Sequence, residues 1–171
     1  MRILERIKTI LAENQISAEI SEEGGFLTAL FPEELTGQEI PAVLSLSSVG
    51  GEDIGMVFEL RFLIADTSHF SSEERQRLLM GCAMLNATLP AGNYGYDLGE
   101  DYEEEDTEAV ETLVYRLGYP LGGAEDEDWI CDQIMTAVTV SATVISDTAE
   151  PLLSVAAGKM SEEEFVEKYL A

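Results

Sequence analysis

The segment from Asp126 to Leu152 constrains the fold most, because its apolar residues recur at intervals of three and four. That spacing puts them on one face of a helix, and they are Ile130, Ile134, Val138, Ala142, Ile145, Ala149 and Leu152. The β-branched residues in this segment would favour a strand by propensity alone, but the length of the helical pattern favours a helix. We expect Pro151 to kink or end it. So long an apolar face has to pack on a sheet, and any surplus is a natural surface for self-association.

Alternating apolar residues predict the sheet that this helix needs. The clearest strand carries five apolar residues on one face: Met56, Phe58, Leu60, Phe62 and Ile64. Residues 40–48 fit a neighbouring strand, and two short strands are expected on either side of the glycine pair at 24–25. Two further strands are expected to pair as an antiparallel hairpin, one containing Tyr94 and Tyr96 and the other Leu113, Tyr115 and Leu117.

Three more helices complete the expected order of elements. The first covers the start of the chain, where charged residues interrupt any signal-peptide core. The second begins near Ser72 with a capping box of Ser71 and Glu74, and a short terminal helix begins with the same motif at Ser161 and Glu164. The sequence therefore predicts a single α+β domain over residues 1–171, with an antiparallel sheet flanked by helices.

The net charge of -25 excludes two broad classes of partner. The chain has 34 acidic and 9 basic residues, and the excess of acid is greatest after Pro90. Nucleic-acid affinity depends on lysine and arginine neutralising phosphates, and anionic lipid is repelled in the same way. We therefore expect neither a nucleic-acid nor a membrane partner. Because we find no stretch of about 18 apolar residues, we expect a cytoplasmic protein.

The stretch GEDYEEEDTE, residues 99–108, lies between the two strands of the expected hairpin. An EF-hand register that begins at Asp97 would place Asp101 and Glu108 at ligand positions, but Gly99 and Tyr102 stand where a third ligand and a glycine are needed. We interpret the stretch as a solvated loop. If it serves as an acidic docking loop, it offers four consecutive carboxylates: Glu103, Glu104, Glu105 and Asp106.

No catalytic signature assembles from the motifs. His69 is the only histidine and has no recognisable triad spacing around it, and the glycine pairs do not match a phosphate-binding loop. Cys82 and Cys131 lie far apart in apolar helical patterns, which favours two buried, reduced thiols. Trp129 suits either an anchor for a partner or a cover for the edge of the core. We therefore expect no enzyme, no cofactor and no metal site.

Two segments of the chain resemble the YbjN family. The first runs from RLLMGCAMLNATLPAGNYGYDL into LVYRLGYPL, a helix ending in Leu85 and Asn86 followed by two aromatic strands around an acidic turn. The second is the tail LLSVAAGKMSEEEFVEKYL, in which a glycine precedes a short capped helix. The resemblance implies the fold of type III secretion chaperones, an antiparallel sheet flanked by helices that is usually dimeric. It brings no catalytic residues, and it implies a binding or regulatory role.

These observations predict a non-enzymatic module that binds a protein or peptide as a chaperone or regulatory adaptor and forms a homodimer. An apolar sheet or helix surface would receive the partner, while the acidic second half attracts basic proteins. We expect four residues to form the self-association surface: Trp129, Ile134, Val138 and Ile145. The alternative is an acidic regulator that senses cations or competes electrostatically for a basic protein partner.

Overall fold

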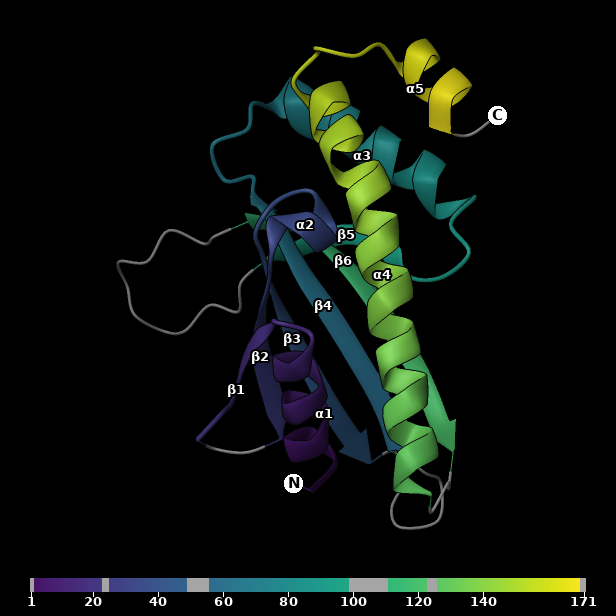
Figure 1. Ribbon diagram of the computed structural model, residues 1–171. Coiled ribbons are helices and arrows are strands. Elements are labelled where there is room, and N and C mark those ends of the chain that lie inside the picture. The colour runs from purple at the N-terminus through teal and green to yellow at the C-terminus, as the bar shows by residue number, and fades with distance from the viewer. Residues whose placement is uncertain (1, 23–24, 49–55, 99–110, 123–125, 170–171) are drawn as a thin grey trace.

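The computed structural model describes residues 2–22, 25–48, 56–98, 111–122 and 126–169 (Figure 1). They form one six-stranded antiparallel sheet with the strand order β1-β2-β3-β4-β6-β5, and α1 and α4 lie on one of its faces. The elements are α1 (Arg2–Glu13), β1 (Ser17–Ile20), β2 (Phe26–Phe31), α2 (Glu33–Thr36), β3 (Ile40–Ser48), β4 (Met56–Asp66), α3 (Ser72–Asn86), β5 (Asn93–Leu98), β6 (Glu111–Gly122), α4 (Glu127–Ala156) and α5 (Glu162–Tyr169). This is the α+β architecture that the sequence predicts.

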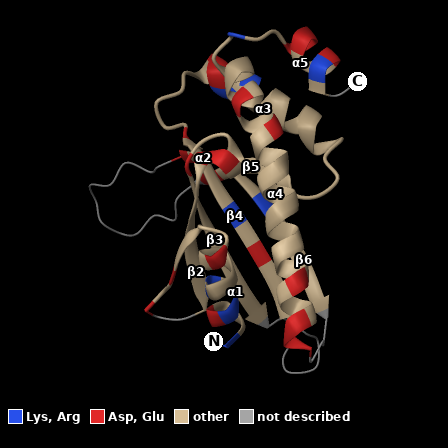
Figure 2. Ribbon diagram, viewed as in Figure 1, with Lys and Arg blue, Asp and Glu red and all other residues tan. Residues whose placement is uncertain are grey.

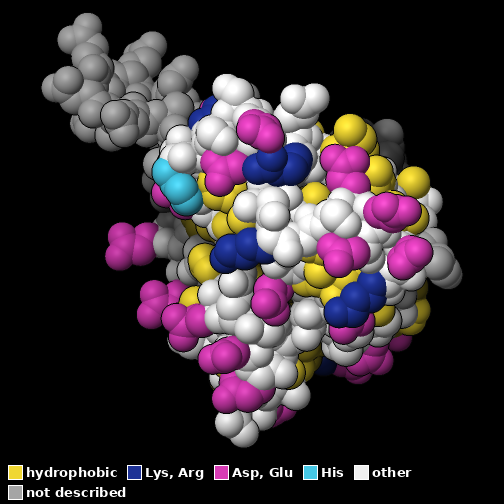
Figure 3. Space-filling view, turned by 90° about the horizontal axis from the view of Figure 1, so that it is seen from above, with side chains coloured by type: hydrophobic (Ala, Val, Ile, Leu, Met, Phe, Trp, Pro, Cys, Tyr) yellow, Lys and Arg dark blue, Asp and Glu magenta, His cyan; other side chains and the backbone are white. Residues whose placement is uncertain are grey.

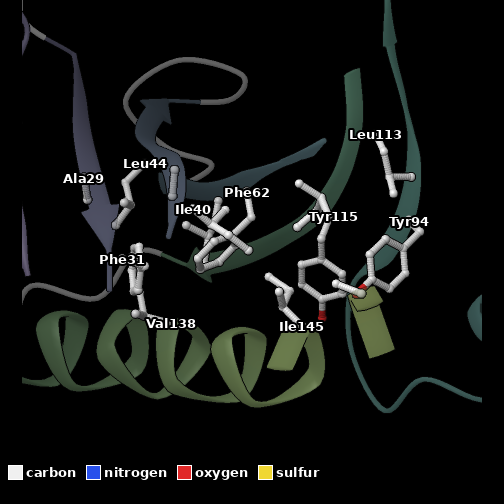
Figure 4. Packing of buried hydrophobic residues seen from close by; sticks show 14 of the residues in the cluster. Ala29, Phe31, Ile40, Leu44, Phe62, Tyr94, Leu113, Tyr115, Val138 and Ile145 are labelled. Atoms are coloured by element: carbon white, nitrogen blue, oxygen red, sulfur yellow. The ribbon is translucent and has the colours of Figure 1, made fainter. Parts of the chain in front are cut away.

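The core lies between the sheet and α4. All seven residues of the predicted helical stripe are buried, as are the alternating residues of β4 from Phe58 to Ile64. Figure 4 shows Val138 and Ile145 of α4 pointing toward aromatic rings of the sheet, among them Phe62 and Tyr115. Burial of one such apolar side chain contributes about 1.5–3 kcal/mol. The contact between α4 and the sheet therefore supplies much of the stability of the domain.

Helix α4 continues through Pro151 to Ala156, so of the two expected outcomes, a kink or an end, the proline does not end the helix. The proline ring is buried, which compensates in part for the hydrogen bond that it breaks. Because proline has no N–H, the carbonyl of Asp147, four residues earlier, lacks its helical donor. The other end of α4 has the expected acidic cap, where Asp126 Oδ1 accepts from the backbone N–H of Asp128 at 2.9 Å.

Helix α3 begins where the sequence predicts. Ser71 Oγ accepts from the backbone N–H of Glu74 at 3.3 Å, and the Glu74 carboxylate accepts from the backbone N–H of Ser71 at 2.8 Å. The same capping box opens α5. Further along, α3 approaches α4 closely at Gly81, where an added Cβ would lie 2.6 Å from Leu152 Cδ1. A larger residue at position 81 would force the buried Leu152 side chain to move, so glycine suits the crossing of these two helices.

Asn86 ends α3 and closes the outer edge of β5. Its side-chain amide donates to the carbonyl of Tyr94 at 2.9 Å, and its Oδ1 accepts from the N–H of Tyr94 at 2.7 Å. Because β5 is the last strand of the sheet, this amide takes the place of a neighbouring strand. The Leu85-Asn86 pair, which contributes to the family resemblance, thus has a structural role.

One element of the fold was not predicted from the sequence, and one predicted segment lies outside the described residues. The single turn α2 was not predicted, because four residues are too few to show a helical period. The strands around the acidic stretch pair as expected, with Leu98 opposite Glu111. The stretch itself lies outside the described residues, and with it the predicted docking residues Glu103, Glu104, Glu105 and Asp106.

Candidate functional site

The four residues predicted to form a self-association surface do not lie together at the surface. Ile134, Val138 and Ile145 are at most 2 % exposed, because they belong to the buried stripe of α4. Figure 4 shows Val138 and Ile145 facing the sheet. The prediction is corrected for these three residues, since α4 uses this face for its own core. Trp129 alone is available to a partner, with 42 % of its surface exposed.

A hollow of about 550 Å³ lies between the C-terminal part of α3 and the outer side of α4. We call it the α3–α4 groove, and its lining residues are Leu85, Thr88, Leu89, Pro90, Thr139, Val140, Thr143, Val144, Asp147, Thr148 and Tyr169. Its volume falls within the range of about 300–1,000 Å³ that is typical of ligand-binding pockets. Most of the residues that line the groove are apolar or are threonines.

The threonines of α4 add little polarity to the groove. The hydroxyl of Thr139 donates to the carbonyl of Met135 at 2.9 Å, and that of Thr143 donates to the carbonyl of Thr139 at 3.0 Å. A threonine that bonds the carbonyl four residues earlier uses its hydroxyl proton inside its own helix. Together with the leucines, valines and proline, these side chains give the groove a mainly apolar surface.

Thr148 connects the groove to the core of the sheet. Its Oγ1 lies 2.8 Å from the phenol oxygen of Tyr94, and the Tyr94 ring packs edge-on against Tyr115 with centroids 5.3 Å apart. Burial raises the pKa of Tyr94 well above its ordinary value, so the phenol stays neutral at physiological pH. Because core contacts hold this wall in place, the groove is formed before any ligand arrives.

The groove is nearly free of charge, although the chain has a net charge of -25. No charged residue occurs from Gln133 to Ser146, and Figure 2 shows this part of α4 as an uncoloured stretch between acidic residues. Asp147 is the one charged residue that lines the groove within the described part of the chain. It is exposed, and it forms no ion pair with another described residue.

The rest of the surface is different in character. Figure 3 looks onto the end of the molecule formed by α3 and α5 and shows acidic side chains spread among apolar patches, with few basic ones. A neutral groove in such a surface is a local exception. The groove was not predicted from the sequence, because Val140 and Val144 lie one turn apart on a side of α4 that the main apolar stripe does not include. Their spacing within an uncharged stretch is the signal that could have revealed it.

The sheet face turned away from α4 is a second exposed surface, and it carries its own ion network. Arg61 and Arg116 lie opposite each other on β4 and β6, and both contact Oδ2 of Asp97, at 3.2 and 3.1 Å. Arg61 also pairs with Glu59 at 2.8 Å. The four charges cancel one another, which is the arrangement of a cross-strand structural network. Asp97, the first position of the EF-hand register, is thereby already engaged by two guanidinium groups.

The described residues hold no group of three or more histidine, cysteine, aspartate or glutamate side chains that could bind a metal ion. His69 is exposed in the turn before α3, where its ring packs edge-on against Phe70. Cys82 and Cys131 are buried and unpaired, as the sequence predicts. Burial raises the pKa of Cys82 to about 12 and also raises that of Cys131. Neither thiol therefore has the environment of an activated nucleophile.

Helix α4 is the one described helix that is long and apolar enough to cross a membrane, judged by length and composition alone. This differs from the expectation that the chain contains no such segment. In the structure the apolar stripe of α4 is covered by the sheet, as in the core helix of a globular domain.

Comparison with known proteins finds similarity at the level of structure. No family model matches the chain, and no curated protein matches it significantly. Among solved structures, the chain is similar to YbjN from E. coli, described as "a putative transcription regulator", with 12% sequence identity and a TM-score of 0.49. The alignment covers 84% of this chain and 89% of that protein. This likeness shows neither membership of the family nor a function.

Proposed function

We propose that this chain is a non-enzymatic protein-binding domain that holds an apolar segment of a partner protein in the α3–α4 groove. The observation that carries the proposal is the groove itself, an apolar hollow of about 550 Å³ with a wall fixed by the Tyr94–Thr148 hydrogen bond. A preformed apolar concavity is the usual place for a ligand on a folded domain. A domain of this kind serves as an adaptor or chaperone, because it binds a partner protein without catalysing a reaction.

The size of the groove suits a few side chains of a helical or extended segment. Each apolar side chain that a partner buries there contributes about 1.5–3 kcal/mol before the entropic cost of association is subtracted. Two or three such side chains contribute roughly 3–9 kcal/mol in total, and subtraction of that cost leaves an affinity weaker than micromolar. Insertion of one amphipathic face between two helices is a common mode of peptide recognition. We therefore expect a reversible complex rather than a permanent one.

The proposal is tested by site-specific photocrosslinking in lysate of the source cells. A benzoylphenylalanine replaces Thr143, inside the groove, or Thr136, which is exposed on the same helix but does not line the groove. We expect discrete protein adducts from position 143, and we expect Val140→Glu to remove them because it places a carboxylate on the apolar wall. Equal adducts from both positions, or adducts that survive Val140→Glu, would mean that the groove is not the binding site.

The expected homodimer is a separate proposal, and its support is the exposed Trp129 at the start of α4. Tryptophan is enriched at the centres of protein interfaces because it buries a large rigid area. Light scattering at high micromolar concentration should give twice the mass of one chain, and Trp129→Glu should halve it. A monomer at that concentration contradicts the dimer and leaves the groove proposal untouched. The alternative role as an acidic regulator depends on residues outside the described part of the chain and stays a prediction.

A further inference from the structure

We infer that the segment bound in the α3–α4 groove is basic as well as apolar, with a lysine or arginine placed against Asp147. The inference rests on the proposed function and names the class of partner. It follows from the charges that line the groove and from the spacing of its residues along α4.

Asp147 offers a carboxylate that the described residues leave unpaired. It is exposed and pairs with no described lysine or arginine. The carboxylate carries a negative charge, so it attracts an ammonium or guanidinium group. A cation placed there gains a charge-assisted hydrogen bond without displacing a described partner of Asp147.

The same groove disfavours an acidic ligand. Its lining contains no lysine or arginine in the described part of the chain, so a carboxylate from a ligand would be buried without a counter-charge. The net charge of -25 adds long-range repulsion of acidic proteins and attraction of basic ones. The groove therefore favours basic over acidic segments, because Asp147 attracts a cation and no described lysine or arginine is present to pair with an anion.

The spacing along α4 defines the pattern that a ligand needs. Val140, Val144 and Asp147 follow one another at intervals of four and three, so they form one row on the helix surface. A helix lying along this row would place apolar side chains against the two valines. One turn further it would place a polar side chain against Asp147. The expected partner segment is therefore an amphipathic helix with a lysine or arginine one turn from its apolar residues.

The test compares two synthetic helical peptides that share leucines at helical spacing and carry either lysine or glutamine at the intervening positions. Binding is measured by fluorescence anisotropy with the wild-type chain and three variants, Asp147→Asn, Asp132→Asn and Val140→Glu. Asp132 is exposed on α4 outside the groove, so Asp132→Asn removes the same charge as a matched control. We expect the contact with Asp147 to make the lysine peptide bind the wild-type chain about two- to fivefold more tightly than the glutamine peptide does. This is the range expected of a single exposed ion pair.

The variants separate failure of the inference from failure of the proposed function. We expect Asp147→Asn to remove that two- to fivefold preference and Asp132→Asn to preserve it. If both variants reduce the preference equally, the attraction is general and Asp147 has no special role, which overturns the inference. If Val140→Glu weakens both peptides while Asp147→Asn leaves the preference intact, the groove binds but the inference is wrong. If Val140→Glu weakens neither peptide, the proposed function fails.

Discussion

At the scale of single residues, a chain of contacts through two tyrosines fixes the relation between the sheet and the helices. Tyr115 donates from its phenol to the carbonyl of Ala91 at 2.6 Å, in the turn that follows α3. Its ring packs against Tyr94, which in turn contacts Thr148 of α4. Each phenol is buried with a partner for its hydroxyl, as buried tyrosines require. These contacts join the turn after α3, β5, β6 and α4 at one place.

Gly92 makes this arrangement possible, and its replacement by alanine should be strongly destabilising. The residue has a φ of 69°, and an added Cβ would lie 2.3 Å from the Tyr115 phenol oxygen. The left-handed backbone alone costs an alanine about 1–2 kcal/mol, and the clash adds to it. We expect Gly92→Ala to lower the free energy of unfolding by roughly 2–4 kcal/mol in urea denaturation.

Gly95 provides the matched control for this substitution. It lies on β5 near Gly92, but an added Cβ there would meet no atom within 4 Å. We expect Gly95→Ala to change the free energy of unfolding by less than about 1 kcal/mol, because alanine loses less backbone entropy on folding. Equal effects of the two substitutions would show that the contact with Tyr115 is not the reason for the glycine.

At the scale of whole elements, the helices differ in whether the residues near their ends favour a helix end. Helices α3 and α5 begin with complete capping boxes, and α4 begins with Asp126 as its cap. Helix α4 departs from good helical sequence near its other end, where Pro151 lies inside it. It remains helical because burial of its apolar stripe outweighs the local cost of about 3 kcal/mol for an interior proline.

We expect Pro151→Ala to stabilise the domain. Alanine restores an N–H donor to the carbonyl of Asp147 and recovers about 3 kcal/mol of helix propensity. It also removes buried methylene groups, each worth about 0.8 kcal/mol, so the net gain should be near 1 kcal/mol. The midpoint of urea denaturation should rise with an unchanged slope. A lower midpoint would mean that packing of the proline ring dominates.

The capping box of α3 gives a prediction about pH. Hydrogen bonds from the Ser71 side chain and backbone lower the pKa of Glu74 below its ordinary value of 4.5. A lowered pKa in the folded state means that the contribution to stability is complete above pH 4.5 and is lost as the pH falls through the folded pKa. We expect Ser71→Ala to cost about 1 kcal/mol at neutral pH and to raise the pKa of Glu74 in an NMR titration. An unchanged pKa would contradict this account.

At the scale of the whole molecule, periodicity predicted most of the fold and little of the candidate site. The stripe from Ile130 to Leu152 and the alternation from Met56 to Ile64 predicted a helix packed on a sheet, because both patterns report burial directly. The same reasoning assigned Ile134, Val138 and Ile145 to a dimer surface. A period indicates that a face is covered, but it does not say whether the chain's own sheet or a second chain covers it.

The groove was harder to predict because two distant segments form it. Leu85 and Leu89 come from α3 and the turn that follows it, whereas Val140 and Val144 come from α4, and neither pair stands out in sequence. Only the packing of the two helices at Gly81 places them side by side. The acidic stretch stood out strongly in sequence, but its carboxylates fall outside the described residues.

The large negative charge predicts how the stability of the whole domain responds to salt. A chain with a net charge of -25 repels itself in the compact state, and added salt screens that repulsion. From about 0.01 to 0.15 M NaCl the Debye length falls from roughly 30 to 8 Å. We expect the unfolding temperature in calorimetry to rise by about 2–4 °C for each kcal/mol of repulsion removed. A constant or falling unfolding temperature would show that local ion pairs matter more than the net charge.

The amide of Asn86 also bears on how copies of the domain behave when they are crowded. It occupies both the N–H and the carbonyl of Tyr94, so these groups cannot pair with a strand of another molecule. Such edge pairing is the step by which fibril-like assembly begins. We therefore expect strand-to-strand association to be disfavoured at this position of the β5 edge.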